Sequence, residues 1–193
     1  MTKWEKTIVV FGVVITLILL VRKARAEDVY QGLNVNNITG KLKKHPSKKY
    51  SKRGLGQIDN LVVHHSATAS GTPQAYANYH VDHNGWPGIG YHFVIQKDGS
   101  IFQTNDLETV SYHVSNHNTR SIGICLTGDY DTQQPPQVQL DQCGFLIAAL
   151  RNKLLQALEI SGHRDFSTKS CPGSNVDLAY IKRVADASSN VAV

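Results

Sequence analysis

Segments with strand character alternate with segments with helix character along residues 58–187, and this alternation limits the fold more than any other feature. Residues 58–64, "IDNLVVH", and 121–128, "SIGICLTG", are rich in branched apolar side chains, as strands are. Residues 91–103, "YHFVIQKDGSIFQ", place two apolar runs around an Asp-Gly pair, which is the strongest short signal for a β-hairpin. The sequence therefore predicts two strands and a hairpin.

Three other segments carry helix signals. Residues 72–82 have Pro73 in the first turn, where its missing N–H costs nothing. Residues 137–158 repeat apolar side chains at intervals of three and four, as an amphipathic helix does, and a shorter helix is expected over 176–187. Strands interleaved with helices predict an α/β fold, a central mixed β-sheet flanked by helices. We expect one domain over residues 58–187, followed by a short tail over 188–193.

The N-terminus carries an uncharged apolar stretch over residues 7–21, behind Lys3 and Lys6. It is shorter than the roughly 20 residues that span a bilayer and fits the core of a signal peptide, about 7–15 residues. Ala24 and Ala26 provide a small-x-small cleavage pattern, whereas Arg22 and Lys23, directly after the apolar residues, are typical of an anchor. Residues 1–26 are therefore a signal peptide or a signal anchor. A buried core helix is disfavoured, because the stretch is apolar on all faces and lies outside the domain.

Positive charge is concentrated before the domain. Residues 1–57 hold twelve Lys and Arg against three Asp and Glu, whereas the rest of the chain holds eight against twelve. Residues 27–57 lack hydrophobic periodicity, which predicts a flexible basic linker that is either a solvated tether or an adhesive for anionic surfaces. A nucleic-acid partner is not expected, because the basic charge is not on the predicted domain.

Two groups of residues have side chains that could bind a metal ion. His64 and His65 end the first predicted strand, and His163 and Cys171 lie in a downstream loop, "SGHRDFSTKSCPG". A lone histidine is more often structural, and the spacing from His163 to Cys171 matches no short zinc motif. A set of two histidines and one cysteine with a fourth position for water is nevertheless a sound catalytic zinc site. The other two cysteines, Cys125 and Cys143, are expected to be small buried residues, because an odd count argues against a disulfide framework.

Four stretches together resemble a known enzyme family. "VVHHSAT", "GWPGIGYHFVIQKDGSIFQ", "NTRSIGICLTGDY" and "GHRDFSTKSCPG" are similar, in this order, to motifs of zinc-dependent N-acetylmuramoyl-L-alanine amidases of phage-lysozyme type. These amidases share their fold with peptidoglycan recognition proteins. The resemblance extends from Ile58 to near Ala187 and leaves the N-terminal residues outside it.

The resemblance implies a set of site residues. The positions of His64, His163 and Cys171 match the family's zinc ligands, and those of Tyr91 and Lys169 match its catalytic pair. His113 matches a position that lines the substrate cleft, so it is expected to contact substrate or else to be structural. His65 should point to the opposite face of its strand from His64.

The implied function is cleavage of the amide between N-acetylmuramic acid and L-alanine in peptidoglycan, by a monomeric exported endolysin. It would act in the periplasm or at the outer face of the bacterial inner membrane, which is the host's membrane if the chain is phage-encoded. A related branch of the family uses a glutamate as catalytic acid or base where this chain has Cys125. The resemblance is therefore to the phage branch, in which Tyr91 and Lys169 are the matching catalytic pair. Two alternatives remain, a non-catalytic peptidoglycan-binding module and a membrane-tethered envelope or virion protein. Non-catalytic proteins of this fold typically have serine at the position of Cys171, which favours catalysis.

Overall fold

The structure, a computed structural model, describes residue 30 and residues 32–189. Within this part of the chain, Leu33 and the residues after it form one compact unit. The expected signal peptide or anchor at residues 1–26 lies outside the described residues. None of the described helices has both the length and the apolar character needed to cross a bilayer.

The compact unit is built on a mixed sheet with the strand order β1-β4-β3-β5-β2-β6. The strands are β1 (Val35–Asn37), β2 (Asn60–His65), β3 (Phe93–Ile95), β4 (Ile101–Gln103), β5 (Ser121–Leu126) and β6 (Glu159–Gly162). The β3–β4 pair is antiparallel, and the other neighbouring pairs are parallel. The predicted mixed sheet is therefore confirmed, and so is the hairpin, whose turn contains Gly99 at a φ of 86°.

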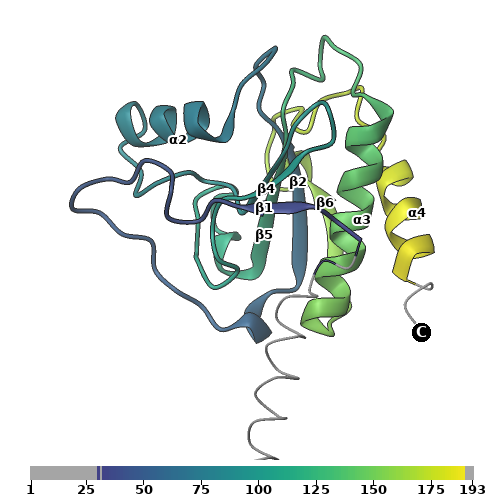
Figure 1. Cartoon of the computed structure of the whole chain (residues 1–193), viewed down its shortest axis with the longest axis horizontal. Helices are drawn as coiled ribbons and strands as arrows, with labels where there is room; N and C mark the ends of the chain where they lie inside the picture. Colours follow the sequence, from purple (N-terminus) through teal and green to yellow (C-terminus); the bar gives the residue numbers. More distant parts are fainter. Residues whose placement is uncertain (1–29, 31, 190–193) are drawn as a thin grey trace, which may run out of the picture. The chain divides into compact units, whose positions relative to one another are not determined.

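Helices cover both faces of this sheet, and they are α2 (Pro73–Asp82), α3 (Gln137–Leu154) and α4 (Leu178–Ser189). On one face, Tyr76 and Ala77 of α2 pack against Val94 and Cys125. On the other face, α3 lies against β3 and α4 packs on α3, and Figure 1 shows this pair on the opposite side of the sheet from α2. Helix α2 begins where expected, because the Thr72 side chain accepts a hydrogen bond from a backbone N–H of the first turn.

The end of the long helix differs from the prediction. Helix α3 stops at Leu154, because Leu155 adopts a left-handed conformation with a φ of 51°. The residues that follow form β6, which pairs with β2 at the edge of the sheet. The expected helix over 137–158 was therefore too long, and the strand at Glu159–Gly162 was not predicted.

The prediction of a flexible linker over residues 27–57 is wrong from residue 33 onward. Val35–Asn37 forms β1 and pairs with β4, and the residues that follow lie against the domain. These residues add seven Lys and Arg to the fold, so the folded unit is basic rather than acidic. The absence of a nucleic-acid partner was expected because the basic charge lay outside the predicted domain. The folded unit does carry basic charge, so this reason no longer holds and the expectation stays a prediction.

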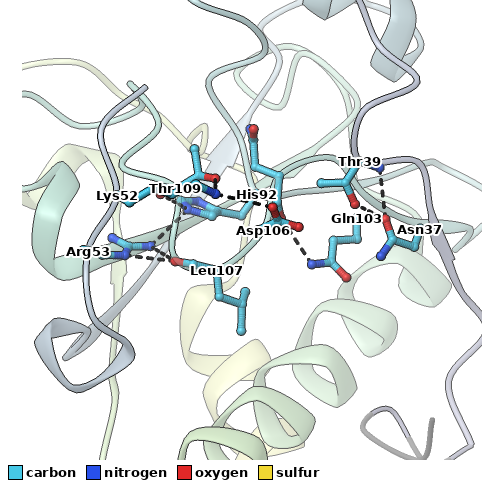
Figure 2. A network of polar contacts seen from close by, with 10 residues as sticks. Asn37, Thr39, Lys52, Arg53, His92, Gln103, Asp106, Leu107 and Thr109 are labelled. Carbon is cyan, nitrogen blue, oxygen red and sulfur yellow. Dashed lines mark hydrogen bonds and ion pairs between the residues drawn. The ribbon is translucent and has the colours of Figure 1, made fainter. Parts of the chain in front are cut away.

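A buried arginine fastens this segment to the domain. Arg53 is 6% exposed, and its guanidinium donates to the backbone carbonyls of Leu107, Asn118, Thr119 and Ser121. Figure 2 shows the guanidinium directed at the Leu107 carbonyl. Burial lowers the pKa of Arg53 to about 10, which leaves the side chain charged at neutral pH. The N-terminal segment is thus held by polar contacts rather than by an apolar stripe.

We expect Arg53→Met to lower the free energy of unfolding by about 3 kcal/mol or more, because several buried carbonyls lose their donor together. Urea unfolding followed by circular dichroism measures this change. Lys49→Met, at an exposed position of the same segment, is the matched control and should change the free energy little. Equal stability of the two variants would show that Arg53 does not hold the segment.

Candidate metal centre

His64 lies near the C-terminal end of β2, on the face that α2 covers. Its register partner in β5 is Cys125, and both side chains are buried. His163 follows β6 directly, in the 3-10 turn His163–Asp165. Because β6 runs parallel to β2, the loop after β6 starts at the same edge of the sheet as His64. The two imidazole rings have centroids 4.8 Å apart.

Cys171 completes a cluster with these two histidines. Its Sγ lies 3.7 Å from His64 Nδ1, and one ligand atom from each of the three residues lies within 4.8 Å of the others. Zinc bonds of about 2.1 Å to nitrogen and 2.3 Å to sulfur, at a tetrahedral angle, place the two ligand atoms about 3.6 Å apart. The predicted residues are therefore brought together at a spacing that fits one zinc ion.

The protonation states at this cluster follow from burial. Burial, with smaller contributions from His113 and His163, holds the pKa of His64 well below its usual value. Burial and then the charge of Lys169 lower the pKa of His163. Both rings are thus neutral at physiological pH, and the neutral ring is the form that binds metals.

Burial disfavours ionisation of the Cys171 thiol, whereas two of its neighbours favour it. Burial raises its pKa to about 11, whereas the His65 backbone N–H, 3.4 Å from Sγ, and the charge of Lys169 act in the lowering direction. A metal ion binds the thiolate and must displace the proton. This set of donors suits a thiophilic cation such as zinc.

His65 has the structural environment expected of it. Its Nδ1 accepts a hydrogen bond from the Tyr130 backbone N–H at 3.1 Å, so in the neutral ring the proton lies on Nε2. His65 also forms a second cluster with Asp129 and Asp131. Neither nitrogen of that ring has a free lone pair, which argues against a second metal site there.

Tyr91 lies beside the cluster of His64, His163 and Cys171, on the segment that leads into β3. Its ring centroid is 5.4 Å from that of His64, and the side chain is partly buried. Burial, with the thiols of Cys125 and Cys171, raises the pKa of Tyr91 well above its usual value. The phenol is therefore protonated at neutral pH and can donate a hydrogen bond.

Lys169 is exposed on the loop that carries Cys171. It influences the site through charge, since it lowers the pKa of both His163 and Cys171. The loop itself is held by Asp131, whose carboxylate accepts hydrogen bonds from the Ser170 hydroxyl at 2.6 Å and the Ser174 backbone N–H at 2.9 Å. These two bonds bracket Cys171. Asp131 comes from the loop after β5, and its role was not predicted from the sequence.

His113 is buried behind His64. His113 is 8% exposed. Its Nδ1 lies 3.1 Å from His64 Nε2, on the opposite side of the His64 ring from Cys171. The other nitrogen of His113 faces the Ser121 backbone carbonyl at 3.4 Å. A Cβ on Gly123 would lie 2.7 Å from the His113 ring, so the glycine makes room for it. A glycine inside a strand is a known signal for such a close approach.

The comparisons with known proteins agree with this geometry. The family described as N-acetylmuramoyl-L-alanine amidase matches residues 54–174. Peptidoglycan-recognition protein SC1a of Drosophila melanogaster is 32% identical over 134 residues, which is 64% of this chain and 72% of that protein. An endolysin of Enterobacteria phage K11 is 32% identical over 123 residues, 60% of this chain and 81% of that protein.

Solved structures of this family have the same architecture. An endolysin described as an N-acetylmuramoyl-L-alanine amidase, from Clostridium intestinale URNW, superposes with a TM-score of 0.69 at 26% identity. The match covers 79% of this chain and 95% of that one. Because the family match over residues 54–174 covers more than half of the chain, the chain belongs to the N-acetylmuramoyl-L-alanine amidase family.

Proposed function

We propose that this chain is a zinc amidase that cleaves the bond between the lactyl group of N-acetylmuramic acid and the L-alanine of the stem peptide in peptidoglycan. The observation that carries the proposal is the separation of His64 Nδ1 and Cys171 Sγ, 3.7 Å, in a cluster with His163. Family membership and relatives named as amidases and endolysins support the reaction class. Zinc, when bound, polarises a carbonyl and lowers the pKa of water.

The neighbouring side chains supply a proton donor and a positive charge. Tyr91, kept protonated by burial, donates a hydrogen bond at the reacting centre. Lys169 stabilises the negative charge that develops on the scissile carbonyl oxygen, which is a typical role for a positioned cation. His64, His163 and Cys171 hold the metal in this assignment.

His113 serves in this proposal as a positioning residue for His64 rather than as a contact for substrate. When His64 offers Nδ1 to the metal, its Nε2–H donates to His113 Nδ1, and His113 Nε2–H donates to the Ser121 carbonyl. This chain of bonds fixes both the tautomer and the orientation of the metal-binding ring. Partners of this kind tune metal affinity in many metal sites.

We expect His113→Ala to weaken zinc binding by about 10–100-fold, because the ring of His64 loses its orienting partner. Chelator competition measures the affinity, and the absorption spectrum of the cobalt-substituted protein reports the ligand geometry. His83→Ala, at an exposed histidine after α2, should leave both unchanged. If His113→Ala raised KM but kept the zinc affinity and the cobalt spectrum, His113 would be a substrate contact.

A second candidate function is that of a binding module without activity, since several relatives are named peptidoglycan-recognition proteins. Cys171 argues for catalysis, because thiolate is a strong zinc ligand. The two functions are separated by zinc content per chain, with and without a chelator, measured beside release of stem peptide from purified wall. Release that stops with chelation supports the amidase, and wall binding without release supports the module.

We propose further that residues 7–21 direct export, so that the enzyme reaches the wall without a hole-forming partner. Deleting residues 2–26 should leave activity on purified wall intact and abolish lysis from within when the gene is expressed in a Gram-negative host. The full-length protein should partition at least partly with membranes. Lysis counts and fractionation measure both effects, and equal lysis by the two forms would contradict export.

A further inference from the structure

A groove of about 550 Å³ lies apart from the cluster of His64, His163 and Cys171. It lies between residues 39–52 and the loops at 87–89 and 104–109. None of the ligand candidates or catalytic candidates lines it. In Figure 1 the segment that forms one wall passes below α2. Lys43 of this segment pairs with Asp82, the last residue of α2, at 2.7 Å. The volume of the groove is in the range of binding pockets for small molecules or for part of a longer ligand, about 300–1,000 Å³.

The lining of this groove is strongly basic. Five lysines and a histidine contribute to it, and they are Lys43, Lys44, His45, Lys48, Lys49 and Lys52. Asp106 is the only acidic residue in the lining, and it pairs with Lys52 at 3.4 Å. Among the described residues, Lys44 and Lys49 have neither an ion pair nor a side-chain hydrogen bond. A concave surface with one sign of charge raises the local concentration of oppositely charged ligands.

Hydrogen bonds hold the charged segment in place. The His45 backbone N–H donates to the Pro87 carbonyl at 3.0 Å, and the Tyr50 hydroxyl donates to the Gly88 carbonyl at 2.8 Å. The Lys48 ammonium donates to the Gly85 carbonyl at 2.6 Å. These bonds place the lysines on the folded unit, so a ligand would not need to order a free tether.

His45 adds a directed donor. Its Nδ1 accepts hydrogen bonds from the backbone N–H groups of Ser47 and Lys48, at 3.2 and 3.1 Å. The neutral ring therefore carries its proton on Nε2, which is free to donate. Together with the two unpaired ammonium groups, this set provides donors only, as anionic oxygens require.

We propose that this lysine groove binds a linear phosphate polymer, as a site separate from the amidase centre. Lysine binds phosphate as a point charge, and several lysines along one groove suit a ligand with repeated charges. A flat bilayer does not enter a concave groove. Tyr50 is the only Phe, Tyr or Trp in the lining and packs edge-on against Tyr112, whereas grooves for single-stranded nucleic acid typically present several aromatic rings on which bases stack.

Titration of the full chain with inorganic polyphosphate, in nonionic detergent and at several salt concentrations, tests this proposal. Lys44→Gln combined with Lys49→Gln should weaken binding at least tenfold at low salt. The slope of log K against log salt should fall by about 1.4, at roughly 0.7 per lost contact on a single-stranded polyanion. Lys182→Gln combined with Arg183→Gln removes the same charge from exposed positions on α4 and should change binding less than twofold.

Each other outcome overturns the proposal. Equal weakening by the two double variants would mean that net charge alone drives binding. Equal affinity for polyglutamate of matched length would exclude recognition of phosphate. Binding only to phosphatidylglycerol vesicles would assign the lysines to a membrane surface, and tighter binding of a thymidine oligonucleotide of matched charge would assign them to nucleic acid. Zinc-dependent wall cleavage should be the same in all variants, so failure here leaves the proposed amidase untouched.

Discussion

Replacing Cys171 with serine is expected to abolish peptidoglycan hydrolysis while leaving a folded domain. The Cys171 Sγ lies 3.7 Å from His64 Nδ1, at the spacing that a shared zinc ion needs, and hydroxyl is a far weaker zinc ligand than thiolate. Zinc content should fall with activity. Serine is similar in size, and the His65 backbone N–H can still donate to its oxygen.

The control for this variant is Cys143→Ala, which removes a buried thiol from α3. It should keep both zinc and turnover, although it loses some stability. Circular dichroism and binding of wall fragments confirm that Cys171→Ser is folded. If Cys171→Ser retained more than a few per cent of wild-type turnover with zinc bound, the assignment of Cys171 as a ligand would be wrong.

Lys169→Ala should retain stoichiometric zinc and yet lose most of its turnover. The side chain is exposed and donates no ligand atom to the cluster, but its charge lowers the pKa of both His163 and Cys171. Losing one preorganised stabiliser of negative charge typically lowers kcat by roughly 10²–10³. Because Lys169 lowers the Cys171 pKa, the variant should also need a higher pH to bind zinc fully.

The matched control is Lys182→Ala, which removes an exposed lysine from α4 and should leave kcat unchanged. Lys169→Arg should recover part of the rate, since the positive charge is restored at a slightly different place. Zinc content and kcat are measured on the same samples. Loss of zinc in Lys169→Ala at high pH would mean that the residue shapes the site, and its catalytic role would be rejected.

The elements with dense apolar patterns could be predicted from the sequence. The strand ending at His64, the hairpin around Gly99 and helix α2 all lie within a few residues of their predicted bounds. Strand β6 was missed, because its four residues include exposed Glu159 and follow a helix pattern without a break. The left-handed conformation of Leu155 ends the helix, and residues 155–158 connect it to the strand.

The N-terminal segment could not be predicted for a different reason. Arg53 fastens it through carbonyls of residues distant in sequence, and such contacts leave no hydrophobic periodicity. The position of the lysines follows from other hydrogen bonds of the same segment, which join His45 and Tyr50 to the backbone at Pro87 and Gly88.

At the site, the resemblance to the amidase motifs selected His64, His163 and Cys171 as candidate ligands, and the fold places one ligand atom of each within 4.8 Å of the others. The contact between His113 and His64 was not predicted, because it depends on how a long loop crosses β5 at Gly123. Asp131 was missed similarly, since it acts across two loops that meet only in the fold.

Digestion of purified peptidoglycan, with mass spectrometry of the released fragments, is the most direct test of the proposed reaction. We expect stem peptides that begin with a free L-alanine amine, glycan chains that keep the lactyl carboxylate, and no release when zinc is chelated. New reducing-end sugars, cleavage within the stem peptide, or no products from zinc-loaded protein would contradict the amidase assignment.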